Sequence, residues 1–192
     1  SAPESLFVVK ALHARAVLEQ RKGLSAQAIA TVTEARSAAV RVVGNSSPLH
    51  AHLLYTQGLA ELDAGMSSQS QATLASALLA ARKASSTRNP GLAKFQLALA
   101  DAQLRAGKNR EANDAIRAAK GLIRNTKADG IVLAELSLLS AASEARAGRY
   151  RSAAKHLDTS LQAIEGWPKS PAIQATHLRI SILRATIASA TG

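Results

Sequence analysis

The sequence predicts an all-α fold, specifically a right-handed α-solenoid of four antiparallel helix pairs followed by a C-terminal capping helix. Three observations predict it. Four glycines recur at intervals of 42, 42 and 41 residues, namely Gly23, Gly65, Gly107 and Gly148. Apolar residues make up 47% of the chain but aromatic residues only 3%, and alanine, the best helix former, is abundant. No segment shows the alternating pattern of a strand, so a helical repeat array fits best.

Prolines and capping residues mark where the first helix of each pair begins. Proline suits the first helical turn because its missing N–H needs no partner there, and a preceding Ser, Asn or Asp accepts a hydrogen bond from a free N–H. The prolines are Pro3, Pro48, Pro90 and Pro171. The capping residues are Ser47, Asn89, Ser170 and, without a proline, Asp129. We expect the second helices to start after each glycine, with caps at Ser25, Ser67 and Asn109.

These signals place the elements in order. The predicted helices cover residues 4–22, 25–43, 48–64, 67–86, 90–106, 109–125, 130–147, 150–165 and 171–190. They form a single domain over 1–192, with repeats at about 3–44, 47–87, 89–127 and 129–168 and a terminal helix at 171–190. The chain begins with Ser1 and Ala2 and ends just after a helix, so we expect it to be a fragment of a larger protein.

Small residues recur at positions that face a neighbouring helix. On the second helices, a small, a large and a small residue follow each glycine by five, nine and twelve positions, which places them on one helical face. The sets are Ala28, Ser70, Ala112 and Ala153; Val32, Leu74, Ile116 and Leu157; and Ala35, Ala77, Ala119 and Ser160. The first helices carry a small residue seven positions before each glycine, at Ala16, Gly58, Ala100 and Ala141. We expect close helix crossings there.

These features resemble the tetratricopeptide repeat, which has a small residue within its first helix, a turn glycine and an Ala-xxx-large-xx-Ala pattern on its second helix. The period is longer than the usual ~34 residues and is similar to the long-period variety of kinesin light chains and large bacterial regulators. Leu12 and Leu54 match the start of the first-helix signature, whereas Gln96 and Ser137 replace it in later units. The resemblance covers nearly the whole chain and implies a scaffold.

The resemblance also implies a binding surface, because the first helices line the concave face of such arrays. It places these residues on the inner wall: Lys10, His13, His52, Tyr55, Lys94, Asp101, Arg105, Arg146 and, from the last helix, Arg184. The wall leans basic and suits an acidic peptide, a chain carboxylate or a phosphorylated segment. The alternative is that each residue is merely solvated. The family's carboxylate clamp for chaperone tails is absent, since His13 and Val17 occupy its positions in the first unit.

A basic stripe on the convex side is a second candidate surface. Its residues are Arg110, Arg117, Lys120, Arg124 and Lys127. A phosphate backbone would fit such a stripe, but charge runs are usually solvated helix flanks. The few aromatic side chains are scattered, which disfavours nucleic acid as the partner.

The sequence lacks the motifs that catalysis and metal binding need. It has no cysteine, phosphate loop, HExxH or GxSxG motif. His50 and His52 are two positions apart, so on a helix their side chains point about 200° apart. We therefore expect no enzymatic activity, cofactor or metal. We expect Trp167, the one tryptophan, to pack between the fourth pair and the last helix as a lid.

The formal net charge of +11 is spread along the chain. A distributed excess favours acidic partners in general. No apolar stretch reaches the length of a membrane span, so we expect a soluble chain. We expect its location to be the cytoplasm. The leading hypothesis is a protein–protein interaction scaffold within a larger bacterial regulatory or signalling protein. The alternatives are a ligand- or peptide-sensing arm that controls an attached effector domain and nucleic-acid binding through the convex stripe. Homo-oligomerisation stays open.

Overall fold

The computed structural model describes residues 5–86, 88–168 and 170–191, and this part of the chain is helical without a strand. The helices are α1 (Leu6–Arg21), α2 (Ser25–Val43), α3 (Pro48–Asp63), α4 (Ser67–Ala84), α5 (Ala93–Arg105), α6 (Asn109–Ile123), α7 (Gly130–Arg146), α8 (Tyr150–Ile164) and α9 (Pro171–Thr191). A short 3₁₀ helix, Pro90–Leu92, precedes α5. The predicted all-α class is confirmed. The helix start predicted at Pro3 lies outside the described residues.

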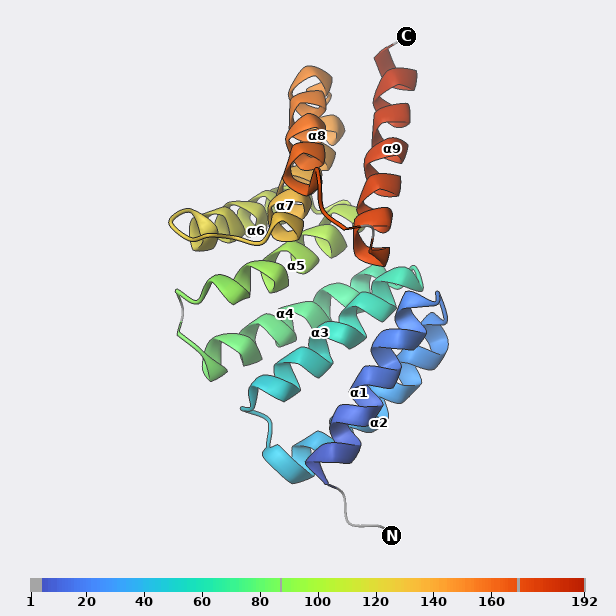
Figure 1. Ribbon diagram of the computed structural model, residues 1–192, viewed down its shortest axis with the longest axis vertical. Coiled ribbons are helices and arrows are strands. Elements are labelled where there is room, and N and C mark those ends of the chain that lie inside the picture. Colours follow the sequence, from blue (N-terminus) through green and yellow to red (C-terminus); the bar gives the residue numbers. More distant parts are fainter. Residues whose placement is uncertain (1–4, 87, 169, 192) are drawn as a thin grey trace.

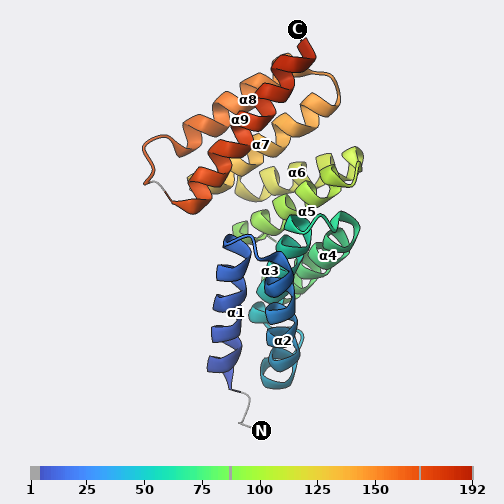
Figure 2. The same ribbon diagram turned by 90° about the vertical axis from the view of Figure 1, so that its right-hand side faces the viewer.

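Adjacent helices pack together along the whole array. Contacts are most extensive between α1 and α2, α3 and α4, α5 and α6, and α7 and α8. The second helix of each couple also packs on the helix that follows it, and the odd-numbered helices contact one another in succession from α1 to α9. Figure 1 shows the resulting stack rising from α1 to α9, and Figure 2 shows it turned by 90°. The odd-numbered helices therefore share one face of the molecule.

The four periodic glycines close the turns between packed helices. Each has a φ of +72° to +78°, a left-handed conformation that favours glycine. At the first turn, Gly23 N–H donates to Gln20 O at 3.0 Å and Leu24 N–H donates to Glu19 O at 2.9 Å. This pair of bonds defines a Schellman motif. It recurs at Gly65, Gly107 and Gly148, which explains the spacing seen in the sequence.

Helix capping agrees with the sequence at the first helices and differs at the second ones. Ser47, Asn89, Asp129 and Ser170 each accept a backbone N–H as predicted. The predicted caps Ser25, Ser67 and Asn109 are wrong, because these residues already lie inside the helices. The N-caps are Leu24, Met66 and Lys108, which make no side-chain cap bond. The residue after each glycine both completes the Schellman motif and begins the next helix, so the turn holds no separate capping position.

The small residues lie at close helix crossings, as expected. A Cβ added to Gly58 of α3 would lie 2.5 Å from Leu74 Cγ of α4, so only glycine fits there without a shift. Two serines that replace alanine in the repeat pattern are buried and donate to backbone carbonyls. Ser70 Oγ donates to Gly58 O and Ser160 Oγ donates to Ala134 O, both at 2.7 Å. Each serine thus fits the small-residue position and satisfies its own hydroxyl.

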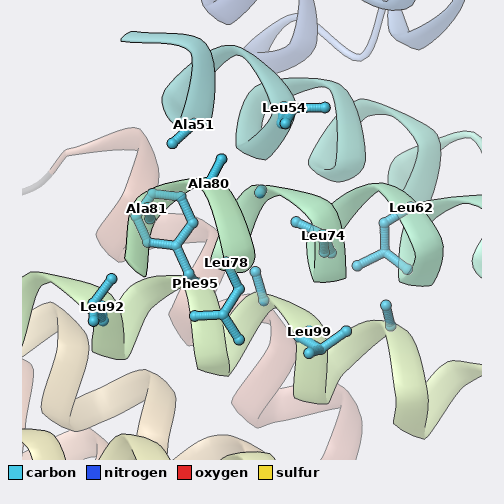
Figure 3. Close-up of a cluster of buried hydrophobic side chains, with 13 residues drawn as sticks. Ala51, Leu54, Leu62, Leu74, Leu78, Ala80, Ala81, Leu92, Phe95 and Leu99 are labelled. Atoms are coloured by element: carbon cyan, nitrogen blue, oxygen red, sulfur yellow. The ribbon is translucent and has the colours of Figure 1, made fainter. Parts of the chain in front are cut away.

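The core between α3, α4 and α5 illustrates how the stack is held. Leu54, Leu74, Leu78, Phe95 and Leu99 are buried and belong to one cluster. Figure 3 shows side chains from the three helices filling a single apolar layer. Similar clusters join the other neighbouring helices. Burial of this kind contributes roughly 25 cal/mol per Å² of apolar surface.

Trp167 lies where the sequence placed it, at the junction of the fourth couple and the last helix. A Cβ on Gly130 of α7 would lie 2.8 Å from Trp167 Cζ2, so the ring covers the start of α7. The same ring lines a pocket of about 560 Å³ with Ile164 of α8 and Ile173 of α9. The tryptophan therefore links three helices.

Candidate functional site

A cavity of about 390 Å³ is lined by α1, α3, α5, α7 and α9. We call it the five-helix cavity. Figures 1 and 2 both show the start of α9 close to the ends of α1 and α3, and the first turns of α9 form part of the lining. Its lining residues are Gln20, Arg21, Leu59, Leu62, Asp63, Ala98, Asp101, Arg105, Glu135, Pro171, Ala172, Ala175 and Arg179.

Three guanidinium groups and three carboxylates converge on the five-helix cavity. They belong to Arg21, Arg105, Arg179, Asp63, Asp101 and Glu135. Asp101 is the centre of the network. Arg105 of α5 approaches Asp101 Oδ1 and Oδ2 at 3.3 Å each, and Arg179 Nη2 of α9 donates to Asp101 Oδ2 at 2.9 Å. A charge-assisted bond therefore ties the last helix to the middle of the array.

Glu135 of α7 is a weakly neutralised carboxylate of this network. Its Oε1 lies 3.9 Å from Arg179 Nη1, although the same guanidinium bonds Asp101 at 2.9 Å. Burial raises the pKa of Glu135, Arg179 partly offsets this, and the Asp101 charge adds to it. The side chain keeps 30% of its surface exposed and lines the cavity. A cationic group placed there would relieve an unfavourable charge.

The rim of the cavity formed by α1 and α3 also carries unpaired charge. Gln20 Nε2 donates to Asp63 Oδ2 at 2.7 Å. In the described part of the chain, no ion pair within 4.0 Å joins Arg21 or Asp63 to a partner. This rim of the cavity thus carries one positive and one negative side chain, Arg21 and Asp63, that no ion pair of the described residues neutralises.

An aromatic cluster, consisting of His52, Tyr55, Lys94 and Phe95, lies further along the same face. The Phe95 ring centroid is 5.0 Å from that of Tyr55 and 5.5 Å from that of His52. Lys94 Nζ is 5.8 Å from the Tyr55 centroid and 5.4 Å from the Phe95 centroid. Such cation–π contacts hold the ammonium over the rings. The cluster borders a pocket of about 230 Å³ between α3, α4 and α5.

The environment of the histidines near this cluster favours their neutral form. His13 Nε2 of α1 is 2.9 Å from Thr56 Oγ1 of α3. Burial lowers the pKa of His13, and burial together with the Lys94 charge lowers the pKa of His52. Burial raises the pKa of the Tyr55 phenol, and the Glu135 charge adds to this effect. At neutral pH the aromatic cluster therefore has Lys94 as its main charge.

The structure groups most of the predicted concave residues but not all of them. His52, Tyr55 and Lys94 form the aromatic cluster, which His13 approaches through Thr56. Asp101 and Arg105 line the five-helix cavity, and Arg146 joins them in an adjoining pocket of about 230 Å³. Lys10 is exposed on α1. Arg184 is not brought to this group, because it pairs with Asp158 of α8.

Sequence reasoning missed five charged or polar residues of the cavity, and the repeat register contained a signal for most of them. Arg21 and Asp63 stand two positions before their glycines, as Arg105 and Arg146 do. Glu135 stands thirteen positions before Gly148, the same register as Lys10, His52 and Lys94. Gln20 stands one position earlier than Arg21. Arg179 belongs to α9, which has no such glycine, so this register could not select it over Arg184.

The convex stripe is fully exposed on α6 and the turn after it. Arg110, Arg117, Lys120, Arg124 and Lys127 all face solvent, while Ala112, Ile116, Ala119 and Ile123 of the same helix are buried. Arg117 pairs with the neighbouring acid Asp114. The stripe is therefore interrupted by negative charge.

A buried polar network lies on the α2 and α4 side of α3. Gln57 Nε2 donates to Glu61 Oε1 at 2.7 Å, and Gln69 Nε2 of α4 donates to the same oxygen at 3.1 Å. Arg36 of α2 donates to Gln57 Oε1. His50 lies near Arg36, whereas His52 packs on Phe95, so the two histidines face different neighbours. The network links three helices within the core.

None of the helices in the described ranges combines the length and the apolar character needed to cross a bilayer. Within the same ranges, no group of three or more His, Cys, Asp or Glu residues is placed to hold a metal ion.

The fold and site define an all-helical chain whose packed helix couples are compatible with a helical repeat. Comparison with models of known protein families finds no match. Comparison with curated proteins finds no match either.

Proposed function

We propose that the protein is a protein–protein interaction scaffold, built as a right-handed α-solenoid of four antiparallel tetratricopeptide-like pairs with α9 as a cap. The observation that carries the proposal is that all five odd-numbered helices line one charged cavity. Residues that recur between units form turns and close crossings, whereas residues that line the cavity differ between units. Variation on a shared face is how repeat arrays build a recognition surface.

The partner segment that suits this face carries charges of both signs. Lys94 in the aromatic cluster favours an acidic side chain, and Glu135 favours a basic one. Charge complementarity of this kind sets specificity and association rate more than affinity. We propose that the module acts within a larger bacterial regulatory or signalling protein in the cytoplasm.

Capture of a partner followed by a binding titration tests the proposal. A partner identified by affinity capture is purified and titrated against the wild-type chain by calorimetry. The double variant Lys94→Glu with Arg105→Glu should weaken binding at least tenfold, because it reverses two charges on the odd-helix face. Lys94→Gln with Arg105→Gln serves as a milder pair if the first folds poorly by circular dichroism.

The matched control reverses two arginines on the opposite face. Arg117→Glu with Arg124→Glu changes the net charge equally but lies on the exposed stripe of α6. Binding should be retained. If this control pair abolishes binding while the Lys94 and Arg105 pair leaves it intact, the interaction surface is convex. The proposal would also be replaced if the wild-type chain bound nucleic acid in a salt-dependent way and the Arg117 and Arg124 pair abolished that binding.

A further inference from the structure

The five-helix cavity has a size typical of small-molecule sites. Its volume of about 390 Å³ lies within the range of roughly 300–1,000 Å³ of known ligand pockets. Five helices contribute to its lining and six charged side chains line it. The pocket beside Trp167 is larger, at about 560 Å³, but only α8, α9 and the turn between them line it. A free amino acid or a dipeptide is of suitable size for such a cavity.

The charges of the cavity restrict the class of ligand. Arg21 has no ion pair within 4.0 Å in the described ranges, and Glu135 has only the 3.9 Å contact to Arg179. A simple anion would leave Glu135 unneutralised, and a simple cation would leave the arginines without an added partner. Arg105 and Arg179 share the single carboxylate of Asp101, and each guanidinium has more N–H donors than these bonds use, so both can donate to a ligand carboxylate. A molecule with one charge of each sign can pair with both the arginines and Glu135.

We propose that the five-helix cavity binds a small zwitterionic molecule of the amino-acid or dipeptide class. Its ammonium group faces Glu135 and Asp63, and its carboxylate faces Arg105 and Arg179. The apolar lining of Leu59, Leu62, Ala98 and Ala175 receives the ligand's hydrocarbon part.

The site also couples the ligand to α9. Arg179 is the side chain by which the last helix reaches Asp101 of α5, 78 positions away. A ligand carboxylate that shares Arg179 adds a contact between α9 and the rest of the cavity. Bound ligand therefore stabilises the packing of α9 on α7 and its bond to Asp101 of α5, which goes beyond the scaffold role.

Thermal stabilisation by defined probes tests the site. The purified chain is melted with each of the twenty free amino acids and with alanyl-alanine, and the best probe is titrated by calorimetry. Its N-acetylated form lacks the positive charge and its amidated form lacks the negative charge. We expect the free zwitterion to raise the melting temperature and each blocked form to bind at least tenfold more weakly.

Two variants locate the binding. Glu135→Gln should weaken the best probe at least tenfold while leaving the melting temperature of the free chain unchanged or higher, since it removes a poorly neutralised charge. Arg105→Gln should weaken the probe similarly, and Arg117→Gln on the convex stripe should not. The proposal is overturned if no probe shifts the melting temperature, if blocked and free forms bind equally, or if both cavity variants bind normally. Partner capture by the unliganded chain is measured separately, so the scaffold role can survive that result.

Discussion

Glycine at the four helix turns is required by backbone geometry and not by crowding. Apart from the adjacent residues of the chain, no atom lies within 4 Å of a Cβ built on Gly23, Gly65, Gly107 or Gly148, yet each residue has a positive φ. Side chains disfavour that conformation because Cβ crowds the following carbonyl oxygen. The spacing of these glycines was therefore enough to predict their role in the turns, because the need for a positive φ is local to each turn.

Gly107→Val should destabilise the chain for this reason. A β-branched residue at φ +77° should lower the free energy of unfolding by about 1–2 kcal/mol. Urea unfolding followed by circular dichroism measures it. Gly107→Asn is the matched control, because asparagine tolerates the left-handed region, and it should cost clearly less than valine. Equal stability of the valine variant and the wild type would show that the turn does not need this conformation.

Three histidines should make stability depend on pH. Burial lowers the pKa of His13, His50 and His52 in the folded chain below the ordinary value of 6.5. The unfolded chain then binds more protons as the pH falls through 6.5, so the free energy of unfolding decreases on acidification and is fully present above that value. Lys94 and His13 face His52, and Arg36 faces His50, which strengthens the effect for both residues.

Urea unfolding at pH 7.5 and at pH 5.5 measures this dependence. The double variant His13→Gln with His52→Gln should lose less stability between the two pH values than the wild type does. Glu135 contributes with the opposite sign, because its raised pKa favours the folded chain at lower pH. That contribution is present in both proteins and cancels in the comparison. Identical pH dependence in the two would mean that these histidines titrate alike in both states.

At the scale of the helices, close crossings decide which positions tolerate change. Gly58 and Gly121 both lie inside helices with ordinary backbone conformation, but their surroundings differ. A Cβ on Gly58 would lie 2.5 Å from Leu74 Cγ, whereas a Cβ on Gly121 meets nothing within 4 Å. Intrinsic helix propensity favours alanine at both positions by a similar amount. Packing between α3 and α4 therefore sets the difference.

Gly58→Ala should destabilise the chain by about 1–3 kcal/mol through overpacking. Gly121→Ala should instead stabilise it by roughly 0.5–1 kcal/mol, because it removes backbone freedom from the unfolded chain without a clash. Chemical denaturation of the two variants in parallel measures the contrast. A neutral Gly58→Ala variant would indicate that Leu74 can move aside and that the crossing is loose.

The sequence predicted the helices well because their signals are local. Turn glycines, prolines and capping residues located every couple, and the small-residue register located the crossings. It placed the caps of the second helices wrongly. The last residue of each Schellman turn is also the N-cap of the next helix, so Ser25, although serine is a common capping residue, already lies inside α2. Of the cavity residues, Asp101 and Arg105 were found, and Arg21, Asp63 and Glu135 lay in the same registers without being selected.

At the scale of the whole molecule, one contact joins the end of the chain to its middle. Arg179 reaches Asp101, whose side chain is only 13% exposed, whereas Arg184 meets Asp158, which is 63% exposed. Sequence could not choose between these arginines, because α9 has no glycine register and the choice depends on how the helix rotates on α7 and α8. Partly buried charge pairs contribute more than exposed ones because solvent screens them less.

Arg179→Ala should loosen α9 more than Arg184→Ala does. Loss of the Asp101 bond should lower the local opening free energy of α9 by about 1 kcal/mol, which is roughly a fivefold faster amide exchange. Hydrogen exchange followed by mass spectrometry over residues 171–191 measures this. The Arg184 variant should change exchange by less than twofold. If amide exchange of α9 were similar in the two variants, apolar contacts alone would account for the packing of α9 on the array.

The shared residue at each Schellman turn also determines where such an array can change its length. A turn in which one residue ends a helix and begins the next has no slack, so an insertion there would misalign two helices at once. The connections between couples, at 44–47, 85–92, 124–129 and 165–170, are longer than the turns within couples, at 22–24, 64–66, 106–108 and 147–149. Duplication, insertion or opening of the chain is therefore tolerated between couples and not within them, which makes the helix pair the unit by which such a protein can grow.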